Sequence, residues 1–354
     1  MDPKTKNSLI KRLVVVTLAL VLYTFLFPRN LGSDLFFKPI KLTQTSSQLG
    51  GAFPDRGVYF KLAEKFGILD PEGTLVSSQE VPKNLAYSDE NYSFYDESTG
   101  TLKILEKGEN QGSLVSQPYS YWIGDRLFVF DENRMGLSEY QPDGVLRWKK
   151  DYPSLITAID AGLNLSIVGL SDGRVEAYDK AGRSRMNYSP GGSRIPVIFN
   201  LALAPSEEYI ALISGLDPKR FILLQKSRDE YRPVFHQPMS DVTRWATALG
   251  FLGDGEWAYY AQKDALHLVD TNSFKEIQIP VKGIVEKVAL DSPSGLLHLV
   301  IREDNRTYID IISLDGLRVA ALSVPGNDIW FRERENRFFL GFEDKILVFQ
   351  KVIK

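Results

Sequence analysis

Few side chains in this sequence are suited to catalysis or to metal binding. The chain has 3 histidines and no cysteine, which excludes a thiolate nucleophile, a disulfide, an iron–sulfur cluster and a cysteine zinc site. His267 and His298 both stand in Leu-His-Leu-Val strings, so we expect them to be solvated or paired residues of a sheet. His236 comes just before a proline at the end of an apolar run and has the same interpretation.

Two short motifs resemble parts of functional loops but are incomplete. Asp131-x-Asn133-x-x-Gly136 is similar to the start of a calcium loop, yet it lacks the third acidic ligand and the closing glutamate. We interpret it as a β-turn stabilised by its own side chains, and we interpret Asp270-x-Asn272 in the same way. The sequence therefore predicts no enzymatic activity, no cofactor and no metal site.

The charge of the chain does not indicate a nucleic-acid partner. Its 42 Lys and Arg residues and 45 Asp and Glu residues leave a net charge of −3 over 354 residues. Without a strong positive field, we expect no binding to nucleic acid. The alternating charges of residues 332–335, Arg-Glu-Arg-Glu, are expected to form a solvated edge or turn.

The N-terminal segment is typical of a membrane anchor. Lysines and an arginine precede the uncharged run of residues 13–27, which consists mostly of Leu, Val and Phe. Such residues favour insertion into a membrane by roughly 3–7 kcal/mol in total. The residues that follow are bulky and do not form a small-residue cleavage site, so an uncleaved anchor is favoured over a cleaved signal peptide.

These features predict three regions in the chain. We expect a cytoplasmic stub with a transmembrane signal-anchor over residues 1–28, and a Gly-, Pro- and Ser-containing linker over residues 29–56. A folded domain is expected over residues 57–354. Because positive charges precede the run of residues 13–27, the predicted location is a single pass of the inner (plasma) membrane. The N-terminus is then cytoplasmic and the C-terminal domain is periplasmic (extracytoplasmic).

From about residue 57, short runs rich in Val, Ile, Leu, Phe and Tyr alternate with turn clusters. Examples of the turns are Pro142-Asp-Gly144, Ser171-Asp-Gly173 and Asp315-Gly316, in which glycine provides the positive φ of tight hairpins. The runs fall into four-strand units of roughly 35–45 residues, a period that is typical of β-propellers. The units are residues 84–118, 119–153, 154–190, 195–238, 239–280, 281–325 and 326–349.

The final unit has only about three strands, whereas residues 57–80 carry spare strands before the first complete unit. We expect an N-terminal strand from this segment to complete the final blade, because closure removes exposed strand edges. The predicted fold is therefore all-β. It is a β-propeller of seven four-stranded blades, closed by N-terminal strands and preceded by one N-terminal transmembrane helix. Six or eight blades remain alternatives, because weakly similar units can be merged or split.

Two of the units resemble the repeats of quinoprotein-like β-propellers, a pattern shared with WD-repeat-like propellers. The pattern is Ala-x-Asp, then Gly, then Trp. In one unit Ala177, Asp179 and Gly182 match the pattern, and Met186 takes the position of the Trp. In the unit before it, Gly144 and Trp148 match. The resemblance implies a propeller of seven or eight blades, whose non-enzymatic members act as scaffolds for envelope protein complexes. No set of residues matches a cofactor site.

The partner-binding candidates lie in two kinds of loop that share one face of a propeller. These loops join the outer strand of one unit to the inner strand of the next, and the second strand of a unit to its third. They contain Arg194, Arg244, Trp245, Asp328, Trp330, Asp172, Lys263 and Asp264. Arg and Trp are enriched at interaction hot spots, although a Trp can instead fill the space between blades.

We therefore expect a membrane-anchored, non-catalytic propeller that scaffolds or recognises an envelope or membrane protein on the exported side. The alternative is an exported ligand-binding or hydrolytic propeller with a polar central funnel.

Overall fold

A computed structural model describes residues 16–17, 35–46, 53–54, 56–115, 119–228, 230–240, 247–291, 294–326 and 328–353. The chain divides into a small unit, Met1–Lys38 with Gln350–Lys354, and a large unit, Pro39–Phe349. In the small unit, the described residues are Val16 and Thr17, which are helical, and the ends of two strands. The large unit contains the β-sheets that are described below.

The described strands form eight antiparallel sheets, which we number as blades 1 to 8 along the chain. Blade 1 contains β2 (Val58–Leu62), β3 (Lys65–Leu69) and β4 (Leu75–Glu80). Blade 2 contains β5 (Ala86–Tyr87), β6 (Asn91–Asp96), β7 (Thr101–Glu106) and β8 (Glu109–Leu114). Blade 3 contains β9 (Tyr119–Ile123), β10 (Arg126–Phe130), β11 (Gly136–Tyr140) and β12 (Leu146–Asp151). Blade 4 contains β13 (Ile156–Ala161), β14 (Leu165–Leu170), β15 (Val175–Asp179) and β16 (Ser184–Tyr188).

The remaining four blades follow in the same order. Blade 5 contains β17 (Ile195–Leu203), β18 (Tyr209–Leu216), β19 (Arg220–Ser227) and β20 (Glu230–Pro238). Blade 6 contains β21 (Leu249–Leu252), β22 (Trp257–Gln262), β23 (Ala265–Asp270) and β24 (Glu276–Pro280). Blade 7 contains β25 (Ile284–Asp291), β26 (Leu296–Glu303), β27 (Arg306–Ser313) and β28 (Arg318–Pro325). Blade 8 contains β29 (Ile329–Arg334), β30 (Arg337–Phe342), β31 (Lys345–Ile353) and β1 (Leu35–Gln44).

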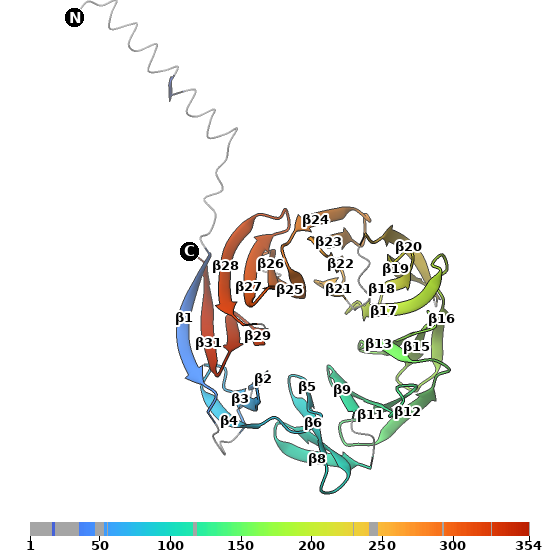
Figure 1. The fold of residues 1–354 in the computed structure, drawn as a ribbon, viewed down its shortest axis with the longest axis horizontal. Coiled ribbons are helices and arrows are strands. Elements are labelled where there is room, and N and C mark those ends of the chain that lie inside the picture. The colour runs from blue at the N-terminus through green and yellow to red at the C-terminus, as the bar shows by residue number, and fades with distance from the viewer. Residues whose placement is uncertain are drawn as a thin grey trace, which may run out of the picture. The chain divides into compact units, whose positions relative to one another are not determined.

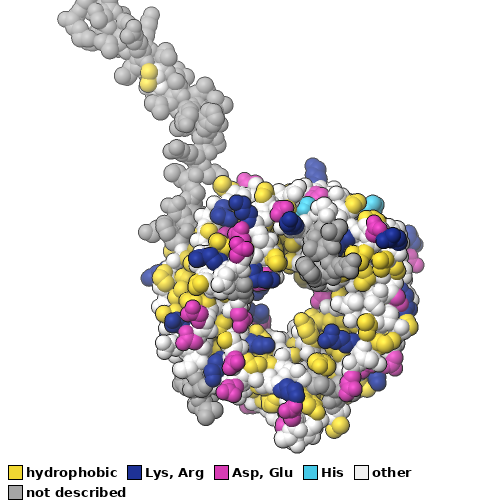
Figure 2. Space-filling view, in the orientation of Figure 1, with side chains coloured by type: hydrophobic (Ala, Val, Ile, Leu, Met, Phe, Trp, Pro, Cys, Tyr) yellow, Lys and Arg dark blue, Asp and Glu magenta, His cyan; other side chains and the backbone are white. Residues whose placement is uncertain are grey.

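The blades stand side by side in a ring (Figure 1), and the space-filling view shows an opening at its centre (Figure 2). In blades 2 to 7 the strands pair in the order of the chain, with the first strand innermost. Consecutive antiparallel strands reverse direction, so two sets of connections share one face of the ring. These are the connections between blades and the loops between second and third strands, and we call this side the loop face.

The ring has eight blades, so the prediction of seven is wrong. The order of blade 8 is β1-β31-β30-β29, which makes β1 the strand that completes it. We expected residues 57–80 to supply that strand, but they form blade 1 instead. The closing strand comes from residues 29–56, the segment predicted to be a linker. Thr43 donates to the carbonyl of Gly73 at 2.6 Å, and Thr45 donates to that of Asp344 at 2.9 Å.

The predicted transmembrane helix is a second expectation that we correct. Among the residues that the structure describes, no helix is both long enough and apolar enough to cross a membrane. Apart from Val16 and Thr17, the predicted span of residues 13–27 lies outside the described residues. The expected fold is therefore corrected to an all-β propeller, and the predicted single-pass location in the inner membrane loses its support.

Apolar side chains fill the spaces between neighbouring blades. Between blades 4 and 5, Ile167 and Ala177 pack with Leu212 and Ile222, all nearly or fully buried. Every residue of β14 is buried, because this strand is covered on both faces by the adjacent blades. This packing explains why the second strands of the units read as continuous apolar runs rather than as alternating ones.

The predicted turn chemistry is confirmed at the hairpin that follows β15. Gly182 has a φ of +73°, and a Cβ atom there would lie 2.6 Å from the Cβ of Trp148. The position therefore needs glycine for the turn and for the close approach of the preceding blade. Trp148 is buried against Phe128 and Tyr178, which confirms its packing role in the repeat.

Candidate functional site in the central channel

The structure places five of the predicted binding residues on the loop face. Arg194 lies just before β17 and Asp328 just before β29, in connections between blades. Asp172 lies between β14 and β15, and Lys263 and Asp264 join β22 to β23. All five belong to connections of the predicted kinds, but they are spread over blades 4 to 8 and do not form one cluster.

Two of these residues form local ion pairs with their neighbours. Arg194 lies 3.2 Å from Asp217, and both side chains are well exposed. Asp172 lies 2.8 Å from Arg174. Partial burial by itself raises the pKa of Asp172, but hydrogen bonds from Arg174 outweigh it and hold that pKa below its usual range. An exposed pair such as that of Arg194 and Asp217 contributes only about 0–1 kcal/mol to stability, so Arg194 stays available to a partner.

The other three predicted residues are Trp330, Arg244 and Trp245. Trp330 is 7% exposed and belongs to the core between blades 8 and 1, with its ring 6.0 Å from that of Phe60. It follows the alternative that we gave for Trp residues, which is to fill the space between blades. Arg244 and Trp245 lie outside the described residues.

A larger feature on the loop face is a hollow of ≈ 510 Å³ at the inner strands of blades 3 to 5. We call it the aromatic pocket. The lining residues used in the argument below are Tyr119, Tyr121, Phe130, Arg134, Phe199 and Asn200. Figure 2 shows the opening at the centre of the ring, with hydrophobic and basic side chains around its rim.

The sequence positions the aromatic side chains of this pocket through strand geometry. Tyr119 and Tyr121 are two residues apart on β9, so they point to the same side of the strand. They are 46% and 59% exposed, which is unusual for aromatic residues of an inner strand. Phe130 is the register partner of Tyr119 on β10 and extends the aromatic wall.

Arg134 supplies the positive charge of the aromatic pocket. Its guanidinium carbon lies 6.0 Å from the centre of the Tyr119 ring, within the range of a cation–π contact. Its backbone has a φ of +57° and its carbonyl accepts the N–H of Ile156 at 2.9 Å, which ties the loop to the next blade. Sequence analysis missed Arg134, since nothing in a short loop indicates that it borders a hollow.

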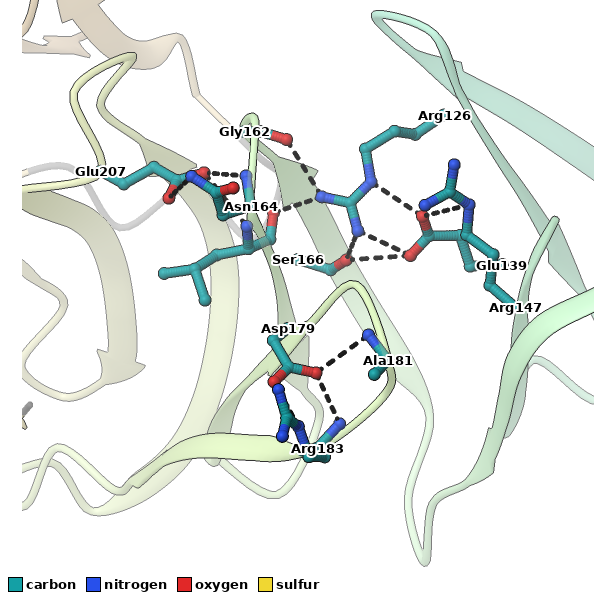
Figure 3. A network of polar contacts seen from close by, with 11 residues as sticks. Arg126, Glu139, Arg147, Gly162, Asn164, Ser166, Asp179, Ala181, Arg183 and Glu207 are labelled. Atoms are coloured by element: carbon teal, nitrogen blue, oxygen red, sulfur yellow. Dashed lines mark hydrogen bonds and ion pairs between the residues drawn. The ribbon is translucent and has the colours of Figure 1, made fainter. Parts of the chain in front are cut away.

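A buried network of charged side chains joins blades 3 and 4, and we interpret it as a structural element of the fold (Figure 3). We call it the seam network. Arg126 and Glu139 form a two-point ion pair, with contacts of 2.9 and 2.6 Å and side-chain exposures of 4% and 0%. Arg126 also donates to the carbonyls of Gly162 and Leu165 and to Ser166. These contacts join β10 to the β13–β14 hairpin.

The histidines behave as solvated or paired sheet residues, as predicted for all three. The Nδ1 atom of His267 lies 2.6 Å from Glu276, and that of His298 lies 2.8 Å from Glu333. His236 is exposed on β20. Over the described residues, no group of three or more His, Cys, Asp or Glu side chains is arranged to hold a metal ion.

The two motifs similar to calcium loops are turns stabilised by their own side chains, as predicted. Asp131 and Asn133 both accept the N–H of Met135, at 2.9 and 2.7 Å. Asp270 accepts the N–H groups of Asn272 and Ser273, at 2.8 and 2.7 Å. In both turns one carboxylate oxygen of the aspartate accepts hydrogen bonds from the backbone.

Comparison with known proteins agrees with this architecture. A protein of Treponema pallidum (strain Nichols), described as uncharacterized, is 24% identical over 338 residues, which cover 92% of this chain and 90% of that protein. The crystal structure of BamB from Moraxella catarrhalis matches with a TM-score of 0.62 at 11% identity, over 89% of this chain and 100% of that one. The computationally designed Ika8 protein matches with a TM-score of 0.65 at 15% identity, over the same shares.

At these identities the solved structures show the fold alone. The broader part of the predicted resemblance, to β-propellers, is confirmed, whereas these comparisons name no quinoprotein or WD-repeat family. A family model described as "beta-propeller protein" matches residues 1–352. The chain therefore belongs to this family of β-propeller proteins.

Proposed function

We propose that this protein is a non-catalytic scaffold that binds another protein through the aromatic pocket on its loop face. The observation that carries the proposal is the exposure of Tyr119 and Tyr121 beside Arg134 in a preformed hollow. Tyr and Arg are the residue types that dominate binding energy at protein interfaces. Aromatic side chains held on a strand also lose little conformational freedom when a partner binds.

The surroundings of the pocket support a protein partner. The exposed ion pair of Arg194 and Asp217 and the loop of Lys263 and Asp264 lie on the same face of the ring. They supply the kind of polar rim that surrounds the centre of an interface. The matches of Gly182 and Trp148 to quinoprotein-like repeats also support a scaffold, because the non-enzymatic members of that group have this role.

Site-specific photocrosslinking tests the proposal. A benzophenone amino acid is placed at Tyr121, and the full-length protein is irradiated in the cells that make it. We expect a discrete crosslinked protein that mass spectrometry identifies. With that protein purified, Tyr121→Ala should weaken binding by about 30-fold, as expected for a hot-spot residue.

The matched control places the same amino acid at Val145, which is 53% exposed in the β11–β12 turn on the other face of the ring. The proposal requires that this position does not capture the same protein. Identical products from both positions, or no product from Tyr121, would show that the aromatic pocket is not the binding surface.

A further inference from the structure

The inner strands of blades 7 and 8 border a second hollow, of ≈ 280 Å³. We call it the basic pocket. The charged residues that line it are Lys287 on β25, Arg332, Glu333 and Arg334 on β29, and Asp89 between β5 and β6. The aromatic pocket is lined by blades 3 to 5 and by residues next to blade 2, so the two hollows share no lining residue.

The packing of β29 holds the two arginines in place. Trp330, Arg332 and Arg334 alternate along the strand and so share one side of it. Trp330 is buried against Phe60 and Phe339. Arg334 donates to the carbonyls of Arg56 and Gly57 at 3.0 and 2.6 Å. The site is therefore preformed, which lowers the entropic cost of binding a ligand.

The charges of the basic pocket are not balanced. Three cations face two carboxylates, and one of these, Glu333, accepts a hydrogen bond from His298 at 2.8 Å. The other carboxylate, Asp89, pairs with Arg332 from a loop and is 66% exposed. Lys287 has a weak contact with the Phe331 carbonyl at 3.4 Å and lies 5.6 Å from the centre of that ring.

The directions of the pKa shifts of Lys287 and Arg332 are consistent with this imbalance. Burial lowers the pKa of Lys287, and the charge of Glu333 offsets this only in part. Burial also lowers the pKa of Arg332, and the positive charge of Arg334 lowers this pKa further. Two cations that repel each other beside a hollow are the arrangement that an added negative charge stabilises.

We propose that the basic pocket binds a small oxyanion, a phosphate or carboxylate group, in the hollow that Lys287, Arg332 and Arg334 line. Guanidinium groups suit both kinds of anion, because their paired N–H donors match two oxygens at once. Pockets for drug-sized ligands measure about 300–1,000 Å³, so this smaller hollow suits a compact anion. The incoming group replaces Asp89 as the counter-ion of Arg332.

Calorimetric titration of the full-length protein tests this proposal. Inorganic phosphate and succinate are titrated separately, at an ionic strength held constant with chloride. We expect saturable binding of at least one of them, and the preferred probe distinguishes a phosphate site from a carboxylate site. Arg332→Gln and Lys287→Met should each weaken binding by about tenfold or more, since each removes a charged partner.

Two further variants make the test specific. Arg302→Gln removes an arginine of blade 7 that pairs with Glu286 outside the pocket, and it should leave affinity unchanged. Asp89→Asn removes the competing carboxylate and should tighten binding several-fold. The proposal is overturned if neither anion binds saturably, if Arg302→Gln matches Arg332→Gln, or if Asp89→Asn weakens binding. Tyr121→Ala should not alter anion binding, so this proposal and the scaffold proposal fail independently.

Discussion

Two groups of charged side chains in the ring differ in how completely their charges are paired. In the seam network, Arg126 and Glu139 pair at two points and the remaining donors of Arg126 reach carbonyls and a hydroxyl. In the basic pocket, three cations share two carboxylates around a hollow. Both groups use arginine and glutamate, but one lies where blades meet and the other lines a hollow at the inner strands.

The difference teaches that residue type alone does not identify a site. In the seam network, Arg147 adds only a longer contact of 3.7 Å to the Glu139 carboxylate. The buried Arg126–Glu139 pair holds two blades together, and its hydrogen-bonding groups are used within the protein, which leaves little capacity for a ligand. A cluster that keeps an excess of one charge beside a hollow retains that capacity. Two of the four substitutions below test these two regions directly, and the other two remove hydrogen-bonded carboxylates elsewhere in the ring for comparison.

The largest effect is expected for Arg126→Ala in the seam network. It leaves the carboxylate of Glu139, which is 0% exposed, without its main partner. We expect the free energy of unfolding to fall by about 3–5 kcal/mol, as measured by urea denaturation. The double variant Arg126→Met with Glu139→Leu should recover most of this loss.

The control for this prediction is Arg302→Ala, which breaks a half-exposed pair with Glu286. Its cost should stay below about 1 kcal/mol. If Arg126→Ala costs no more than Arg302→Ala, the seam network is not a structural element and the contrast between the two regions disappears.

A smaller loss is expected for Glu207→Ala, at the seam between blades 4 and 5. The carboxylate of Glu207 accepts the N–H groups of Asn164 and Leu165 and is itself buried (Figure 3). Removing it leaves these N–H groups unpaired, so we expect a loss of about 2–3 kcal/mol in the unfolding free energy. The exposed neighbour Glu208→Ala is the control, and an equal loss there would contradict the assignment.

A pH-dependent loss is expected for Asp179→Ala at a turn. Burial alone raises the pKa of Asp179, but hydrogen bonds from Arg183, Arg185 and Ala181 outweigh it and lower that pKa below its usual range. The carboxylate therefore adds stability above the unfolded-state pKa, about 3.9, which is lost as the pH falls further. We expect a cost of about 1 kcal/mol at pH 7.

Thermal unfolding between pH 7 and pH 3 checks this prediction. The difference between the wild type and Asp179→Ala should shrink below about pH 4, whereas Asp254→Ala in an exposed turn should differ little at any pH. A difference that stays constant across this range would show that the charge of Asp179 is not what stabilises the turn.

The smallest effect is expected for Lys287→Met in the basic pocket, and it has the opposite sign. Because burial lowers the folded-state pKa of Lys287, its charge opposes folding at neutral pH and ceases to do so as the pH rises toward about 10.4. We expect a gain of about 0.5 kcal/mol in unfolding free energy at pH 7, which shrinks near pH 10.

Lys282→Met, at an exposed position before β25, is the control and should have little effect. A loss of more than about 1 kcal/mol in Lys287→Met would mean that Lys287 is a satisfied structural residue, like those of the seam network. That result would remove the contrast on which the anion proposal depends.

Much of the fold could be predicted from local sequence. The turns at Gly144, Gly173 and Gly316 have φ values of +87°, +87° and +85°, as their Asp-Gly signatures predict. The seven predicted units correspond to blades 2 to 8, with the missing strand of the last one supplied from the N-terminal side. Residues 57–80 were assigned to that closure, because nothing local distinguishes a spare strand from a blade of its own.

The candidate sites were less accessible to sequence analysis. The alternating charges of residues 332–335 suggest a solvated edge, but Arg332 and Arg334 lie on an inner strand beside a hollow. Trp330 is one of the partner-binding candidates, but it is buried between blades, which is the alternative given for Trp residues. The aromatic pocket is assembled from several strands, and a single stretch of sequence does not report such an assembly.

The sequence by itself determined the all-β class, the positions of most hairpins and the repeating unit, because these depend on residues only a few positions apart. The tertiary structure alone decided the number of blades, the closing strand and which distant side chains contact one another. Thr45 and Asp344 are 299 residues apart, and His298 and Glu333 are 35 apart. The first contact exists only once the ring has closed and the second only once blades 7 and 8 have packed together, and no local pattern of side chains specifies either.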